Sequence, residues 1–177
     1  MSDQEERNLV REAREGDRDA FGKLVRMHQR RIHALGRRLL GTAEDADDLV
    51  QETFLRAWKA LERFDAERPL APWLVRIATN RAMTLLEVRQ RRPVEELEDT
   101  VPDPGDLPDE ATERRRLHER VRQHLEGLPE DQRAILVLRA TDQLSYREIA
   151  DTLDIPIGTV MSRLARARET MRKRMKR

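Results

Sequence analysis

The apolar residues of this chain recur every three to four positions over most of its length, the spacing of amphipathic helices. Residues 17–40 predict a helix that buries one face and ends at Gly41. Thr42 can cap a second helix that continues to about residue 64. After a break with two prolines, residues 73–92 predict a third long helix, which Pro93 stops. Three long helices are therefore predicted between residues 17 and 92.

The periodicity stops over residues 93–112, where prolines and acidic groups leave too little apolar surface to offset the entropy of ordering. It resumes at about Thr112, breaks at Gly127–Pro129 and then predicts three further helices, the last from about Thr159 to Lys173. The expected fold is all-α, with two small helical domains joined by a flexible acidic linker. The expected boundaries are 1–92, 93–113 and 114–177.

The charges of the chain are segregated along its length, although its net charge is only +1. Residues 1–92 hold 19 basic and 16 acidic groups, residues 93–113 none and 9, and residues 114–177 hold 16 and 9. Two basic modules around an acidic spacer favour a polyanionic partner, so nucleic acid is the leading class.

Residues 144–168, LSYREIADTLDIPIGTVMSRLARAR, have the form of a helix-turn-helix. In SYRE, residues 145–148, Ser145 and Glu148 can form a capping box. The second helix would lie in a major groove, with Thr159, Ser162, Arg163, Arg166 and Arg168 toward the DNA. An ordinary helical hairpin with a solvated basic face is the alternative, and the charge favours DNA binding by roughly four to one.

Residues 43–61, AEDADDLVQETFLRAWKAL, predict a helix whose exposed face holds Asp48, Gln51, Glu52 and Leu55. An acidic, partly apolar face does not suit DNA. A protein-docking site and a solvated face, supported by pairs such as Glu52 with Arg56, remain equally good interpretations.

Residues 69–93 interleave arginines with Trp73 and Asn80. An asparagine amide can pair with a base edge, and an indole can stack on an unpaired base. Burial is the favoured interpretation for Trp73, by roughly two to one, because large aromatic residues are mostly buried.

The sequence offers no motif for catalysis or for a cofactor. The four histidines lack the spacing of a helical metal pair, and there is no glycine-rich phosphate loop, nucleophile motif or cysteine. No enzyme activity, metal or cofactor is therefore expected. No segment approaches the length of a membrane span and no signal peptide begins the chain, so a cytoplasmic protein without membrane insertion is expected.

Three separated motifs occur in one order: DADDLVQETFLRAW, WLVRIATN, and LPEDQRAILVLRATDQLSYREIADTLDIPIGTVMSRLARARE. Together they resemble the ECF (extracytoplasmic function) subgroup of the sigma-70 family of RNA polymerase sigma factors. The resemblance covers nearly the whole chain apart from the linker. It implies a subunit that lends core RNA polymerase its promoter specificity, with sigma region 2 at 1–92 and sigma region 4 at 114–177.

The resemblance also implies roles for individual residues. The acidic helix, with Asp48, Gln51, Glu52 and Leu55, would dock on the clamp coiled coil of the largest polymerase subunit. The loop from Phe64 to Pro72 would capture a flipped non-template base of the minus-ten element. The minus-ten contacts implied are Phe64, Asp65, Trp73, Arg76, Asn80, Arg91 and Arg92. The contacts implied with the duplex minus-thirty-five element are Ser145, Thr159, Ser162, Arg163 and Arg166.

Further partners follow from the resemblance alone. They are the polymerase flap for the carboxy-terminal domain and an anti-sigma factor, and the acidic linker would pass through the RNA-exit path. Two positions depart from the family pattern. Met161 stands where arginine is usual, which predicts a lost DNA contact or an apolar one in its place. Thr84 stands where many members have aspartate.

One rival class of function shares the helix-turn-helix. A stand-alone transcription regulator with a LuxR-like carboxy-terminal domain would bind its operator without polymerase, whereas sigma factors of this kind bind promoters weakly alone. The acidic face around Asp48 discriminates between them. A structural helical adaptor is a weaker rival, because it does not explain two basic modules.

Overall fold

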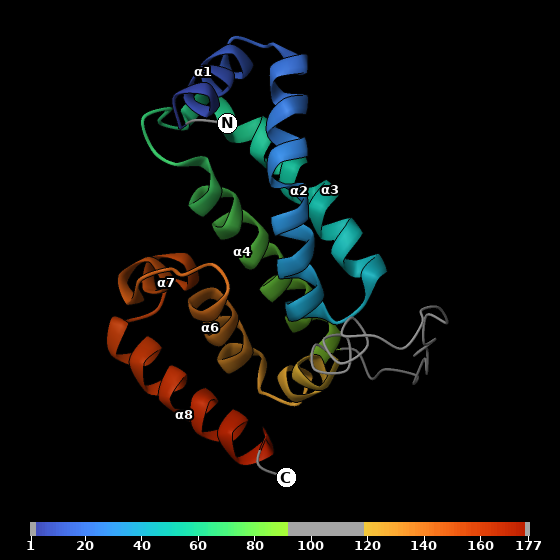
Figure 1. Cartoon of the computed structure of the whole chain (residues 1–177), viewed down its shortest axis with the longest axis vertical. Coiled ribbons are helices and arrows are strands. Elements are labelled where there is room, and N and C mark those ends of the chain that lie inside the picture. The colour runs from blue at the N-terminus through green and yellow to red at the C-terminus, as the bar shows by residue number, and fades with distance from the viewer. Residues whose placement is uncertain (1–2, 92–118, 176–177) are drawn as a thin grey trace, which may run out of the picture.

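The computed structural model describes residues 3–91 and 119–175, and every regular element in these ranges is helical (Figure 1). The amino-terminal domain consists of α1 (Asp3–Arg14), α2 (Arg18–Leu40), α3 (Ala43–Ala60), the 3₁₀ turn η1 (Leu61–Arg63) and α4 (Leu70–Arg91). The carboxy-terminal domain consists of a helical segment at 119–126, α6 (Glu130–Ala140), α7 (Tyr146–Leu153) and α8 (Ile157–Met175). The all-α prediction is confirmed. The predicted linker lies outside the described residues.

The ends of α2 follow the predicted signals. The Asp17 carboxylate caps the helix by accepting from the amides of Asp19 and Ala20, at 2.8 and 3.0 Å. Gly41 ends it with φ of 93°, a conformation that a side chain would strain. Thr42 then caps α3 by accepting from the Asp45 amide at 3.1 Å. The short connection makes α2 and α3 neighbours.

Two predicted boundaries shift. The break at residues 64–72 is shorter than expected, because α4 begins at Leu70 rather than Trp73 and includes Pro72 in its first turn. Proline is tolerated there, since the first amide groups of a helix have no partner within the helix. Helix α8 likewise begins at Ile157, two residues before the predicted Thr159. Helix α1, which the sequence analysis did not predict, buries Val10 and Ala13 in the core.

The apolar residues form one cluster that continues from the amino-terminal into the carboxy-terminal domain, where α6 and α7 pack against α2 and α4. Two arginines form polar contacts across this boundary. Arg133, on α6, donates to the Leu39 carbonyl in the last turn of α2 at 2.8 Å. Arg31, on α2, forms an ion pair with Asp142, whose side chain is only 1% exposed. The two domains therefore form a single packed body in this structure.

Candidate nucleic-acid interface

The exposed face of α3 presents three of its four predicted docking residues to solvent. Asp48, Gln51 and Leu55 lie on one side of the helix, and Leu55 is 61% exposed, the most exposed large apolar side chain in the described part of the chain. Buried residues Ala46, Leu49 and Thr53 fix the opposite side in the core. The acidic and apolar face is thus held in a fixed orientation.

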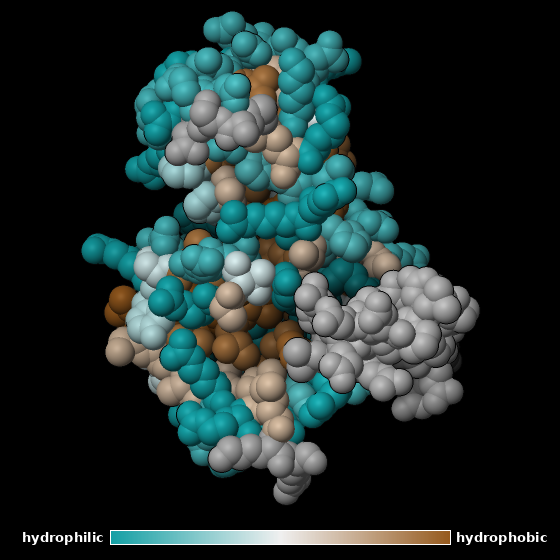
Figure 2. Space-filling model, in the orientation of Figure 1, coloured by the Kyte–Doolittle hydropathy of each residue, from teal (hydrophilic) through white to brown (hydrophobic). Residues whose placement is uncertain are grey.

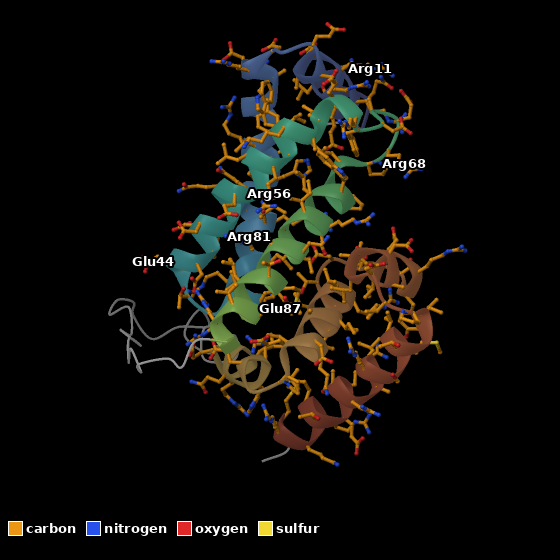
Figure 3. All side chains as sticks on the ribbon, turned by 180° about the vertical axis from the view of Figure 1, so that it is seen from behind. Arg11, Glu44, Arg56, Arg68, Arg81 and Glu87 are labelled. Atoms are coloured by element: carbon orange, nitrogen blue, oxygen red, sulfur yellow. The ribbon has the colours of Figure 1, made fainter. Side chains whose placement is uncertain are left out.

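Glu52, the fourth predicted docking residue, lies between helices α3 and α4. Its carboxylate accepts a hydrogen bond from the Arg81 guanidinium at 2.7 Å. The Arg56 guanidinium lies 3.7 Å from the same carboxylate, and Figure 3 labels both arginines. The side chains of Glu52 and Arg81 are 39% and 22% exposed. This pair, which joins residues 29 positions apart, was not predicted. It holds α3 and α4 together along the edge where the docking face meets the face of α4.

The loop before α4 and the first turns of that helix line a cleft of about 690 Å³. Phe64, Asp65, Trp73 and Arg76, four of the predicted minus-ten residues, all line it. The rings of Phe64 and Trp73 are stacked at a tilt, with their centroids 4.5 Å apart. Trp73 is only partly buried, so its packing against Phe64 leaves part of the indole facing the cleft. Trp73 therefore packs against the core on one side, as the favoured interpretation expected, and lines the cleft on the other.

The loop of this cleft is shaped by Asp65. Its carboxylate accepts from the Glu67 amide at 3.0 Å, and its carbonyl accepts from the Arg68 amide at 3.0 Å. Arg68 is exposed after this turn (Figure 3), and it lines the cleft together with Arg63. Neither arginine was predicted as a site residue. Arg63 directly precedes the break and Arg68 lies within the loop implied to capture a base, and in the structure both join Arg76 around one opening.

Asn80 lies further along α4, in a second hollow that it shares with Trp73, Arg81 and Arg56. The Asn80 side chain is exposed, and its backbone carbonyl accepts from the Thr84 hydroxyl at 3.0 Å. Thr84 therefore bonds within its own helix, where an aspartate would place a negative charge. Arg91 ends α4, but its side chain lies outside the description, and Arg92 lies outside the described residues.

The helix-turn-helix is confirmed in α7 and α8. Ile149, Ala150, Val160 and Leu164 are buried between the helices. Asp154 turns the chain in the left-handed region with φ of 52°, which aspartate tolerates better than most residues. The turn sets α8 with its first residues exposed at the surface.

The predicted minus-thirty-five residues on α8 differ in their exposure to solvent. Ser162 and Arg166 are exposed on α8, and Thr159 is half-buried. Arg163 pairs with Asp131 of α6 at 3.0 Å, so its guanidinium is partly engaged inside the domain. These residues come from one helix face, and their roles in DNA binding stay predictions.

Ser145 is the amino-terminal cap of α7, and the predicted capping box is present. The Ser145 hydroxyl accepts from the Glu148 amide at 3.2 Å, and the Ser145 amide donates to the Glu148 carboxylate at 2.7 Å. Hydrogen bonding of the Glu148 carboxylate to the side chain and the backbone amide of Ser145 lowers the pKa of Glu148. A depressed folded-state pKa stabilises the fold above the unfolded-state value, and this stabilisation is lost as the pH falls through the folded-state value.

We expect Ser145→Ala to lower the free energy of unfolding by about 1 kcal/mol, because the first turn of α7 loses its cap. Urea unfolding followed by circular dichroism measures the change. Ser162→Ala is the matched control: its exposed hydroxyl donates only to the Thr159 carbonyl of its own helix, so little change is expected. The deficit of Ser145→Ala should shrink in acid, where Glu148 is protonated. A variant as stable as the wild type at neutral pH would contradict this role.

The comparison with known proteins covers both domains. The family Sigma-70 region 2 matches residues 24–92, and the family Sigma-70, region 4 matches residues 118–171. The ECF RNA polymerase sigma factor SigW of Bacillus subtilis (strain 168) is 34% identical over 94% of this chain and 95% of its own. The chain belongs to the ECF subgroup of the sigma-70 family.

Other similar proteins support the same family for this sigma factor. The ECF RNA polymerase sigma-E factor of Escherichia coli (strain K12) is 39% identical over 92% of this chain and 90% of its own. The structure of CnrH in complex with the cytosolic domain of CnrY has a TM-score of 0.71 at 31% identity, covering 97% of each chain. The protein thus acts as an RNA polymerase sigma factor in promoter recognition and transcription initiation. The LuxR-like regulator is not favoured, because residues 24–92 match sigma region 2.

One structural finding bears on the membrane. Within residues 3–91 and 119–175, no helix is both long and apolar enough to cross a bilayer.

Proposed function

We propose that this sigma factor, a cytoplasmic protein, uses three separate surfaces in initiation. The face of α3 with Asp48, Gln51 and Leu55 binds the clamp coiled coil of core polymerase. The cleft between the loop at 64–69 and α4 holds the opened non-template strand of the minus-ten element. The exposed face of α8 contacts the duplex minus-thirty-five element. The proposed domain boundaries are those given above, 1–92 and 114–177.

The observation that supports this division most strongly is the pair of unlike surfaces on adjacent helices α3 and α4. One is acidic and apolar, which suits a protein partner and repels phosphate. The other combines the stacked rings of Phe64 and Trp73 with the guanidinium of Arg76. Aromatic faces and cations suit single-stranded DNA, because its bases stack on aromatic rings and its phosphates attract positive charge. The Glu52–Arg81 pair couples the two faces.

Strand opening has a free-energy cost that the cleft must offset. Flipping one base from the duplex costs about a few kcal/mol. Stacking on an aromatic side chain contributes about 1–3 kcal/mol for each base, and a hydrogen bond from Asn80 to a base edge adds specificity. The cleft and the neighbouring hollow at Asn80 therefore have the chemistry to hold a strand open once polymerase has placed it there.

The carboxy-terminal domain has a second groove that suits a protein. Its lining combines the apolar side chains of Val121, Leu125, Leu136, Val137, Met171 and Met175 with the arginines Arg38, Arg168 and Arg172. Figure 2 shows apolar surface exposed on the half of the molecule that holds α6 and α8. An amphipathic helix with acidic residues would fill such a groove. We assign it to the polymerase flap.

The same sigma factor is proposed to have an anti-sigma partner. CnrH, whose fold and length match this chain, was solved in complex with the cytosolic domain of CnrY. Both the α3 face and the apolar groove are exposed surfaces that such a partner could cover. Regulation would then act by competition with core polymerase.

Site-specific photo-crosslinking in the assembled holoenzyme tests the assignment of surfaces. A photoreactive residue at position 80 should crosslink to the non-template strand of the minus-ten element, and one at position 162 to duplex DNA upstream. One at position 55 should crosslink to the largest polymerase subunit. A matched probe at exposed Glu12 on α1 should crosslink to neither DNA element. Crosslinks from position 80 to duplex DNA upstream would contradict the proposal.

A further inference from the structure

Helix α8 exposes two large apolar side chains in its first two turns. Ile157 is 49% exposed and Met161 is 54% exposed. They are four residues apart and therefore share one face of the helix. Figure 2 shows apolar surface at the left side of the molecule, where α8 begins. A Cβ built on Gly158 would meet only open space, so this helix end is unobstructed.

The opposite side of α8 fixes the direction of this apolar face. Val160, Leu164 and Ala167 are buried against the rest of the domain. Nearby, the Ser162 hydroxyl is already donated to the Thr159 carbonyl at 3.1 Å. Arg166 and Arg168, further along the helix, are exposed. The helix thus offers apolar groups at its beginning and cations beyond them.

The base edges of the major groove have one apolar feature, the C5 methyl group of thymine. The first residues of a recognition helix are those that meet base edges, and its later cations meet phosphates. We propose that Ile157 and Met161 contact thymine methyl groups, so that the minus-thirty-five element of this sigma factor requires thymine at neighbouring positions. This inference rests on the proposed function of α8. It makes Met161 a specificity-determining residue.

The test removes only the methyl groups. The probe is a promoter duplex bound by the holoenzyme, with the thymines of its upstream element replaced by uracil one at a time. Each methyl group lost beneath α8 should weaken binding about four-fold, the effect of one buried CH₂-sized group. Met161→Gln should weaken binding to the thymine duplex by a similar factor and should lose its sensitivity to uracil at one position.

Glu169→Gln is the matched control, because Glu169 is exposed on the same helix, far from its beginning, and lies outside the groove assigned to the flap. It should retain the full discrimination between thymine and uracil. Equal affinity of the wild-type holoenzyme for thymine and uracil duplexes at every position would overturn the inference. So would weaker binding by Met161→Gln with unchanged uracil sensitivity, since that result indicates a protein partner for this face. Failure of the holoenzyme to bind the thymine promoter at all would instead count against the proposed function.

A different observation concerns the minus-ten cleft. Leu144, Glu148, Asp151 and Thr152 of the carboxy-terminal domain line the same cleft as Phe64 and Trp73. The two carboxylates of α7 therefore share one opening with Arg63, Arg68 and Arg76. A DNA strand that entered this cleft would therefore bring its phosphates close to two carboxylates.

The ion pair of Arg31 and Asp142 holds this arrangement. Its Nε–Oδ1 distance is 2.8 Å, and the same guanidinium donates to the Asp142 carbonyl at 3.4 Å. The second carboxylate oxygen of Asp142 is buried without a hydrogen-bond partner. The burial of the Asp142 carboxylate therefore requires the Arg31 cation, because a buried charge without a partner is strongly unfavourable. Loss of Arg31 would therefore favour separation of the domains, which returns Asp142 to water.

We infer that α7 closes the minus-ten cleft in the free sigma factor, and that the carboxy-terminal domain must move away before a DNA strand enters. The chain has no cysteine, so Lys59→Cys and Arg172→Cys, both at exposed positions, give a uniquely labelled pair for distance measurement. The free wild-type chain should give one narrow distance distribution. Arg31→Glu should broaden it, and should strengthen binding of a single-stranded minus-ten oligonucleotide about ten-fold or more, the effect of losing one buried charge partner.

Arg26→Glu, an exposed charge reversal on the same helix, is the control and should leave the distances unchanged. A wild-type distribution already as broad as that of Arg31→Glu would overturn the inference. So would an Arg31→Glu chain that opens but binds the oligonucleotide no better than the wild type.

Discussion

Asp48→Lys combined with Leu55→Asp is expected to abolish binding to core polymerase while the chain stays folded. Both side chains are exposed on α3 and make none of its core contacts. The double variant replaces an acidic group by a cation and puts a charge where an apolar anchor would be buried. Anchors of an interface contribute about 2 kcal/mol or more each, so the affinity should fall at least about 100-fold.

The choice of residues for this experiment depends on the structure. Glu52, although on the same helix, is bonded to Arg81, so Glu52→Lys would disturb the contact of α3 with α4 as well as any interface. The matched control is Glu12→Lys, which reverses an exposed charge on α1. Binding to fluorescently labelled core polymerase measures the affinity, and circular dichroism verifies the fold. A folded double variant that binds core polymerase like the wild type would rule out this docking face.

Asn80→Ala is expected to lower open-complex formation on duplex promoters about ten-fold or more, the effect of losing one good hydrogen-bonded contact with a base. On a template already melted over the minus-ten element the loss should be much smaller, because the energetic cost of base flipping has been removed. Permanganate reactivity of unpaired thymines measures the open complex on both templates.

The control for this experiment is Asn8→Ala on α1. Asn8 is exposed and bonds only the side chains of Gln4 and Arg11 in its own helix. It should leave open-complex formation unchanged on both templates. Equal losses for Asn80→Ala on duplex and pre-melted DNA would show that Asn80 contributes to binding in general and has no role in melting.

The parts of the fold that were predicted correctly are those determined by neighbouring residues. The Thr42 cap, the Gly41 stop and the Ser145–Glu148 capping box each depend on groups at most a few positions apart. The sequence pattern likewise predicted the two helices of the helix-turn-helix. Such local patterns are visible in a sequence because the physics that favours them acts over one turn of helix.

What was missed depends on residues distant in the chain. The family resemblance implied a docking role for Glu52, but its pairing with Arg81 of another helix was not predicted. Arg133 bonds a carbonyl 94 positions away, and Arg31 pairs with Asp142 at a separation of 111. No spacing rule predicts such contacts. Arg63 and Arg68 were overlooked for the same reason, since only the folded loop brings them to the cleft of Arg76.

The most direct test of the central claim adds the purified chain to bacterial core RNA polymerase and genomic DNA, and sequences the 5′ ends of the transcripts. If the chain is a sigma factor, new starts appear only in its presence, preceded by two conserved elements at a fixed spacing. The Asp48→Lys/Leu55→Asp variant should remove these starts. An unchanged set of starts, with specific duplex binding by the chain alone, would contradict the account and indicate a stand-alone regulator.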